Sequence, residues 1–192
     1  KLILIFFLTS TGIARQIGET EITTEDGIEV YQNERFYLLK KNVVIEADNF
    51  TLSADNVKIN FNENMYDIIE LNAKGGVVFD SNQSNTKGSG ENLNFKVQLE
   101  QIKVEGINSE LFTDDIKMFS DGFIKVNNSN GKFTLIGPNS KLTNESILIE
   151  GEFIDGIFSN DQDEKQIVFL NVIDDNISYV KNNDSEMFAK KI

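Results

Sequence analysis

The sequence predicts an all-β protein made of stacked antiparallel strands, and three observations lead to that prediction. From Glu21 onward, apolar and polar residues alternate with a period of two, and no long stretch has the 3.6-residue period of an amphipathic helix. Clusters of Asn, Asp, Gly and Ser separate the alternating segments. A short phrase also recurs along the chain: an apolar residue, a small residue, an acidic or polar residue, and then alternating apolar positions. Such a recurrence is typical of one supersecondary unit used several times.

The recurring phrase is spaced unevenly. It occurs at residues 52–59, 89–95, 111–118, 136–142 and 188–192. Its small residue is Ala54, Gly90, Thr113, Gly137 and Ala189, at intervals of 36, 23, 24 and 52 residues. These intervals favour antiparallel strands joined by hairpins of unequal length. A parallel β-helix is the alternative, although its rungs need more uniform lengths.

Individual strands follow from the alternation. Residues 93–99 alternate most regularly, with Leu93, Phe95, Val97 and Leu99 on one face. The pair Gly75-Gly76 predicts a tight turn or bulge between residues 68–71 and 77–79. Residues 80–90 lack apolar side chains, which predicts a long surface loop. Further strands are expected at 153–158, 167–172 and 177–180, and Asn130-Gly131 predicts a hairpin.

The first fourteen residues read as an export signal. Lys1 precedes an apolar run, Leu2 to Leu8, and small residues stand at Gly12 and Ala14, where a signal peptidase would read them. The run is too short for a membrane span of about 20 residues. We therefore expect a signal peptide at 1–14, lacking its first residues, and one domain at 15–192 that either is cut short at its C-terminus or leaves an open sheet edge there. A buried N-terminal strand and an uncleaved short anchor are the alternatives.

Composition excludes several functions. The chain of 192 residues has no Cys and no His, which removes disulfides, thiolate nucleophiles, thiolate metal sites and the usual imidazole base. Its formal net charge is −13, and loss of residues 1–14 with Lys1 would make it −14. A nucleic acid would be repelled by this charge, and no basic stripe with interleaved aromatics is present.

Evidence for an enzyme is thin. Acid pairs such as Asp114-Asp115 and Asp174-Asp175 are neighbours in sequence, so on a strand they point to opposite faces and not across a cleft. The run 161–164 could attract calcium but lacks the spacing, central glycine and closing Glu of a dedicated loop. We expect no catalytic residues, no metal site and no cofactor.

The apolar faces are the remaining candidate site. In a β-sandwich these faces fill the core, whereas in an opened sandwich they line a trough wide enough for lipid tails. The parity of the alternation selects as trough-facing Val43, Ile45, Val57, Ile59, Phe61, Leu93, Phe95, Val97, Leu99, Ile116, Met118, Ile124, Val126, Phe133 and Leu135. A simply packed interior, as in a plain interaction module, fits the same pattern.

Residues 39–61, LKKNVVIEADNFTLSADNVKINF, resemble the opening repeat of the LptA/OstA family of lipopolysaccharide-transport proteins. The match consists of Asn42-Val43 and of Leu52-x-Ala54-Asp55, where the family has a Gly- or Asn-Val step followed by a leucine, a small residue and an aspartate. Residues 73–95 are similar to a second repeat, and residues 21–29 to the first strand. In the second repeat, Gly90-Glu91 stands where a small residue and an acid or other polar residue are usual.

The resemblance implies a V-shaped β-jellyroll in the periplasm that binds lipopolysaccharide acyl chains in its trough and carries them from the inner to the outer membrane without catalysis. It also implies partners of the LptC and LptD types at the sheet edges and head-to-tail association with further copies. An LptC-like anchored component, or an exported β-helix protein acting as an adhesin or on carbohydrates, is the alternative. Because lipopolysaccharide carries phosphates, the negative charge predicts that only the tails are held.

Overall fold

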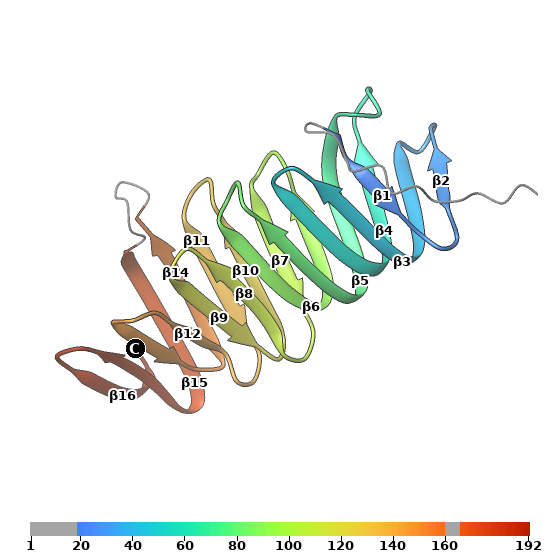
Figure 1. The fold of residues 1–192 in the computed structure, drawn as a ribbon. Helices are drawn as coiled ribbons and strands as arrows, with labels where there is room; N and C mark the ends of the chain where they lie inside the picture. Colours follow the sequence, from blue (N-terminus) through green and yellow to red (C-terminus); the bar gives the residue numbers. More distant parts are fainter. Residues whose placement is uncertain (1–18, 160–165) are drawn as a thin grey trace, which may run out of the picture.

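The computed structural model describes residues 19–159 and 166–192. Every secondary-structure element in these ranges is a β-strand (Figure 1). The strands are β1 (Glu21–Thr23), β2 (Ile28–Tyr31), β3 (Phe36–Ala47), β4 (Phe50–Phe61), β5 (Ile68–Ser81), β6 (Thr86–Lys96), β7 (Gln101–Glu105), β8 (Ser109–Thr113), β9 (Ile116–Ser120), β10 (Phe123–Asn127), β11 (Lys132–Ile136), β12 (Lys141–Thr143), β13 (Ile147–Glu150), β14 (Phe153–Phe158), β15 (Ile167–Asn182) and β16 (Glu186–Lys191).

The strands form one antiparallel sheet that folds back on itself. Every pairing in the described part of the chain is antiparallel. From β6 the order runs β7-β10-β11-β14-β15 along one wall and returns β13-β12-β9-β8 along the other, where β8 pairs with β6 again. The all-β antiparallel jellyroll is thereby confirmed, and the parallel β-helix alternative is wrong.

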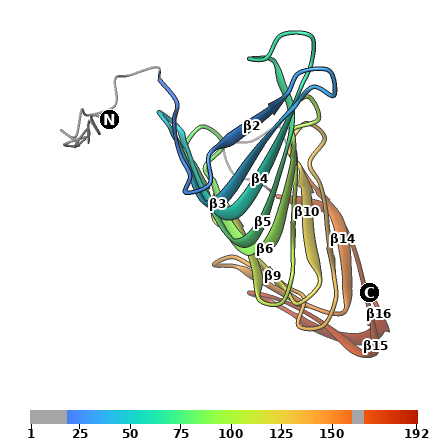
Figure 2. The same ribbon diagram turned by 90° about the vertical axis from the view of Figure 1, so that its right-hand side faces the viewer.

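We call each step of the stack a level: one long strand that crosses both walls, or two consecutive strands with one in each wall. Each level bends near its middle, where the chain passes from one wall to the other. The strands β3 to β6 and β15 continue through the bend, in β5 with a shift in register between Lys74 and Val77. The levels between β6 and β15 are split into two strands, such as β7 and β8. The predicted bulge at the glycine pair in β5 is one of these bends. Viewed along the stack, the aligned bends give a V-shaped cross-section (Figure 2).

The bends recur more regularly than the sequence phrase suggests. From Gly75 they lie 14 to 16 residues apart, at Gly75, Glu91, Gly106, Gly122, Gly137 and Gly151. The unequal intervals arose because the phrase mixes bends with hairpin tips. Gly90 and Gly137 lie at bends, but Thr113 ends β8 at a hairpin.

Two neighbouring bends, at Gly122 and Gly137, require glycine because successive levels touch there. A Cβ on Gly122 would overlap the carbonyl oxygen of Ile136 and lie 3.1 Å from Cα of Gly137. A Cβ on Gly137 would lie 2.6 Å from the nitrogen of Gly122, and Gly137 also has a φ of +129°. Both positions therefore bring two backbones closer than any side chain allows.

Side chains fill most of the space between the two walls. Inward positions alternate with outward ones along each strand, and Leu39, Val43, Leu111, Phe133 and Ile154 are at most 1% exposed. Inward hydroxyls are bonded: Ser120 Oγ donates to the Ile136 carbonyl at 3.0 Å and lies 3.0 Å from Ser140 Oγ. Along its middle the interior is thus a continuous cluster of buried apolar side chains.

Three strand predictions need correction. The loop expected at 80–90 is confined to 82–85, because Thr86 and Gly88 occupy inward positions of β6 without an apolar side chain; a Cβ on Gly88 would lie 2.9 Å from the ring of Phe79. The strand expected through residue 99 ends at Lys96. The two strands expected at 167–172 and 177–180 are one bent strand, β15.

Two sequence predictions fall outside the described residues. The proposed signal peptide at 1–14 and the acidic run at 161–164 both lie there. Within residues 19–159 and 166–192, the structure contains no helix that is long and apolar enough to span a membrane.

Candidate functional site

The open side of the V is bordered by two rows of hairpin loops. One row contains residues 48–49, 82–85, 114–115 and 144–146, which are linked in order by hydrogen bonds such as Asn82 N–H to the Asn49 carbonyl (3.0 Å) and Asn144 Nδ2 to Asp115 Oδ2 (3.2 Å). The other row contains residues 97–100 and 128–131, linked by the Asn128 N–H, which donates to the Glu100 carbonyl at 3.1 Å. We call the space between the two rows the mouth. The bends place these loops together although they are far apart in sequence.

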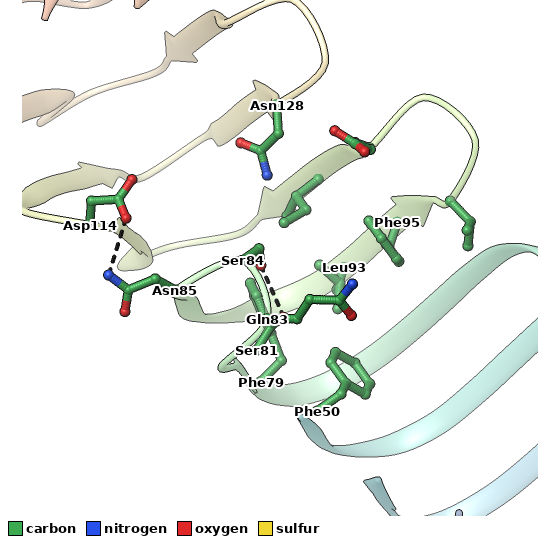
Figure 3. Close-up of a pocket in the computed structure, with 13 residues that line it drawn as sticks. Phe50, Phe79, Ser81, Gln83, Ser84, Asn85, Leu93, Phe95, Asp114 and Asn128 are labelled. Carbon is green, nitrogen blue, oxygen red and sulfur yellow. Dashed lines mark hydrogen bonds between the residues drawn. The ribbon is translucent and has the colours of Figure 1, made fainter. Parts of the chain in front are cut away.

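A first cavity of about 610 Å³ opens at the mouth (Figure 3). Its apolar wall is formed by Phe50, Phe79, Leu93, Phe95, Val97 and Ile102. Its polar rim is formed by Ser81, Gln83, Ser84, Asn85, Glu100, Asp114 and Asn128. An apolar wall with a few polar groups at the opening, in a volume within about 300–1,000 Å³, is the usual form of a small-molecule site.

A second cavity of about 830 Å³ adjoins the first one. It is lined by Asn85, Asp114, Asp115, Ile116, Leu142, Asn144, Glu145, Ser146, Ile147, Gln166, Ile167 and Asn182. Asn85 and Asp114 line both cavities. Asn85 Nδ2 donates to Asp114 Oδ1 at 3.1 Å, and the Asp114 N–H donates to the Asn85 carbonyl at 3.1 Å (Figure 3). The two cavities therefore follow one another along the mouth and are separated by this pair.

The structure distributes the fifteen trough-facing candidates over three environments. Leu93, Phe95 and Val97 line the first cavity, and Ile116 lines the second. The packed interior holds Val43, Ile45, Val57, Ile59, Phe61, Met118, Ile124, Val126, Phe133 and Leu135, each at most 8% exposed. Leu99 lines neither cavity. Contact of any of these residues with a lipid stays a prediction.

Val97 and Leu99 differ from the other candidates. They lie in the β6–β7 hairpin and are 37% and 50% exposed, so they do not belong to an inward strand face. The strand stops because Glu100 adopts a φ of +47° and the Glu100 N–H donates to the Val97 carbonyl at 3.0 Å, which closes a turn. The sequence pattern cannot detect this change, because apolar residues continue at every second position through the turn.

Sequence reasoning missed the polar rim. Gln83, Ser84 and Asn85 lie in the segment expected to be a plain surface loop, and Asn128 lies in the turn before Asn130-Gly131. Their composition is that of any turn, so no sequence signal distinguishes them. Their role depends on which loops face one another across the mouth.

Among the described residues, the charged side chains that line the two cavities are all acidic. The charged residues that line the two cavities are Glu100, Asp114, Asp115 and Glu145, and no Lys or Arg of the described residues is among them. Lys103 and Lys125 lie instead on the outer face of the wall, next to each other on β7 and β10.

A cluster of polar side chains on the outer face of the sheet lowers the pKa of Glu70. Glu70 accepts hydrogen bonds from Asn94 Nδ2 (2.7 Å) and Asn60 Nδ2 (2.9 Å), and the bond from Asn94 is the largest cause that lowers the pKa of Glu70 below 4.5. The cluster is on the opposite side of the wall from the cavities, so it supports the sheet. In the described residues no three His, Cys, Asp or Glu side chains are placed to hold a metal ion.

Fold and site together define a class: a V-shaped β-jellyroll whose apolar interior opens along a mouth between two loop rows. The family described as "LptA/(LptD N-terminal domain) LPS transport protein" matches residues 22–122, more than half of the chain. The chain belongs to this family.

Among solved structures, the chain is similar to LptH from Pseudomonas aeruginosa, described as the LptA homologous periplasmic component of the conserved lipopolysaccharide transport device. The match has 11% sequence identity and a TM-score of 0.47, and covers 57% of this chain and 76% of LptH. No curated protein matches the chain in sequence.

Proposed function

We propose that this protein is a non-catalytic periplasmic carrier of lipopolysaccharide, which holds acyl chains in the two cavities along the mouth and passes them between the inner and outer membranes. Membership of the lipopolysaccharide-transport family supports the cargo class and the compartment. The observation that carries the proposal is the first cavity, with its apolar wall, and the second cavity that adjoins it at the open side of the V.

The energetics suit a carrier. Each apolar group transferred from water to the walls of Phe50, Phe79 and Phe95 contributes about 25 cal/mol per Å² of buried apolar area. The walls supply this affinity without any covalent or charged grip on the tails. The packed interior next to the cavities limits how deep a chain enters, so binding stays reversible and the cargo can move on.

The ends of the stack provide the proposed partner surfaces. β1 and β2 pair only with β3, and β16 pairs only with β15, among the described residues. Each of these strands has a second backbone edge that can accept a strand from a neighbour through main-chain hydrogen bonds. LptC-like and LptD-like proteins and further copies of this chain are the proposed neighbours.

The test is binding of purified lipopolysaccharide to the purified protein and to two matched variants. Phe95→Asp places a carboxylate in the wall of the first cavity, and Phe112→Asp places the same group on the outer face of β8. We expect Phe95→Asp to weaken binding at least about tenfold, because one buried charge costs several kcal/mol in an apolar site. Phe112→Asp should bind as the wild type does. Equal binding by all three proteins, with both variants folded by circular dichroism, would refute the proposal.

A further inference from the structure

The outer face of the wall that contains β7, β10 and β11 is rich in lysines. Six strand segments pair side by side to form it: residues 56–61 of β4, 68–74 of β5, 92–96 of β6, and all of β7, β10 and β11 (Figure 1). Their charged side chains alternate with buried residues and therefore point outward. They are Lys58, Lys74, Lys96, Lys103, Lys125 and Lys132, against Glu70 and Glu105. We call this surface the lysine face.

The lysine face differs in sign from the chain as a whole. Its six lysines and two glutamates give it a formal charge of +4, whereas the net charge of the chain is −13. The next strand in the wall, β14, adds one outward carboxylate, Asp155. The charges on the opposite outer face are more than about 10 Å away, because two packed layers of sheet are that far apart. At 0.1 M salt they are largely screened, so an approaching surface responds to the lysines.

Two of the lysines repel each other. Lys103 and Lys125 are directly opposite on β7 and β10, and like charges at such positions destabilise a sheet. Lys103 pairs with Glu105 at 2.5 Å, and Lys58 Nζ lies 4.1 Å from the centre of the Phe36 ring. The positive excess remains after these contacts. An anionic surface laid against the face would relieve the repulsion.

An apolar stripe borders the lysines on the same side of the wall. Phe123, Ile136, Phe153 and Ile173 are successive cross-strand neighbours on β10, β11, β14 and β15. They occupy outward positions and are half-buried, except Ile173, which is 38% exposed. Lys103 Nζ lies 4.5 Å from the centre of the Phe123 ring, so the stripe and the lysines adjoin. One surface thus combines positive charge with apolar side chains, the combination that binds at a membrane interface.

The spread of the lysines favours an extended anionic partner over a single small ion. They are distributed over six neighbouring strands, which at about 4.8 Å between strands is a width of about 24 Å. Both cavities open at the mouth and not on this face. A free phosphate could therefore contact only a few of the lysines, whereas a layer of lipid head groups could contact all of them.

We propose that the lysine face and the apolar stripe dock this protein on an anionic lipid bilayer, with the lysines over acidic head groups and the stripe at the boundary between head groups and acyl chains. Lysines near an anionic bilayer and buried apolar area both add to such binding. The inference goes beyond the proposed function, because it concerns the outside of one wall and requires no lipid in the mouth. The loop row at 97–100 and 128–131 ends the same strands, so docking brings the mouth close to the bilayer.

The test is co-sedimentation of the full chain with vesicles of phosphatidylcholine alone or of an equal mixture with phosphatidylglycerol, with EDTA present. We expect clear binding to the anionic vesicles at about 0.1 M salt and its loss at about 1 M salt, where the screening length falls to about 3 Å. Matched variants separate the lysine face from the rest of the chain, including the apolar run Leu2 to Leu8.

Two triple variants remove the same charge from opposite outer faces. K58Q/K103Q/K125Q changes the lysine face, and K87Q/K117Q/K141Q changes the other wall. Each set contains one lysine near an aromatic ring and one lysine in an ion pair with a glutamate. The first variant should bind anionic vesicles at least about tenfold more weakly than the wild type, because each lysine near such a surface contributes about fivefold. The second variant should bind as the wild type does, and so should K58R/K103R/K125R, which keeps the charge.

A fluorescent reporter shows which face meets the bilayer. The chain has no cysteine, so a single introduced cysteine can carry an environment-sensitive fluorophore. Thr134→Cys places it on the outer face of β11 next to the stripe, and Ser89→Cys places it on the outer face of β6 in the other wall. Anionic vesicles should shift the emission to the blue at position 134 and leave it unchanged at position 89.

Several results would overturn the inference: no binding to anionic vesicles, equal weakening by both glutamine variants, or equal shifts at positions 134 and 89. If the lysine-face variant fails to fold by circular dichroism, the two fluorophore positions decide. None of these results bears on the binding of acyl chains in the mouth, which the lipopolysaccharide-binding test addresses separately.

Discussion

Replacing Gly122 by Ala tests whether the bends of the stack are as close as the structure shows. Gly122 lies at the bend between β9 and β10, and its φ is not positive, so Ala meets no backbone strain there. The added methyl group would overlap the carbonyl oxygen of Ile136 and approach Cα of Gly137 to 3.1 Å. Since both obstacles are backbone atoms, neither can rotate away. The two levels must move apart.

The expected cost follows from this overlap. Overpacking costs about 1–3 kcal/mol in general, and a backbone obstacle places Gly122→Ala near the upper limit of about 3 kcal/mol. At about 2–4 °C for each kcal/mol in a domain of this length, the melting temperature should fall by about 6–12 °C. Gly76→Ala is the opposite case, with a φ of +54° and nothing within 4 Å of the new methyl group. It should cost about 1 kcal/mol, because strain in the left-handed region is partly offset by a stiffer unfolded chain.

Thermal unfolding followed by circular dichroism measures both variants, together with Gly137→Ala and the double variant at positions 122 and 137. Gly137→Ala combines overlap with a positive φ and should be the least stable single variant. The double variant should lose less stability than the sum of its parts, because both methyl groups force the same two backbones apart. If Gly122→Ala melts within about 1 °C of the wild type, the close approach at the bends is refuted.

Three further variants probe the interior and the outer face. Leu135→Ala should lower the free energy of unfolding by about 2–5 kcal/mol, because it leaves a void in the fully buried core. Ser120→Ala should lower it by about 1–3 kcal/mol, because it removes a buried hydroxyl that bonds three neighbouring groups. Glu70→Gln should destabilise the protein at pH 7, because the hydrogen bond from Asn94 stabilises the charged carboxylate. The difference from the wild type should vanish as the pH falls from 4.5, the pKa of an ordinary glutamate, through the lower pKa of Glu70 in the folded protein.

Urea unfolding at equilibrium measures these three changes, with a control variant for Leu135→Ala, another for Ser120→Ala, and a comparison of two pH values for Glu70→Gln. Ile107 is 67% exposed, so Ile107→Ala should change stability by no more than about 0.5 kcal/mol. Ser129→Ala is the control for Ser120→Ala: it removes an exposed hydroxyl from the β10–β11 turn and should also change stability little. A loss at Leu135 as small as the one at Ile107 would argue against a packed interior. A Glu70→Gln difference that is the same at pH 7 and pH 3 would show that ionised Glu70 does not stabilise the fold.

The alternation of residue types predicted the strands and their inward faces well, because a sheet with one dry face imposes a period of two. It placed Val57, Ile59 and Phe133 inside, where the structure buries them. It failed where a glycine occupies an inward position, as at Gly88. Neighbouring groups approach too closely there for a side chain, so no apolar residue marks the inward face in the sequence. It also failed at Val97 and Leu99, where a turn continues the spacing of a strand.

The site could be predicted only in part for a related reason. Leu93 and Phe95 were accessible to sequence reasoning because they lie on an alternating strand. Asn85, Asp114 and Asn128 line the same cavity only because the strands bend and bring distant hairpins together. The bends themselves are marked by Gly, Asn and Asp, the same residues that mark hairpin tips, so local composition does not separate the two.

Photo-crosslinking in living cells tests the central claim, that lipopolysaccharide tails occupy the mouth, most directly. A benzophenone amino acid replaces Phe95 in the wall of the first cavity or, as the matched control, Phe112 on the outer face of β8. Irradiation should give an adduct that carries lipopolysaccharide from position 95 and none from position 112. Adducts of equal yield at both positions, or none at position 95 in a folded protein, would contradict the account.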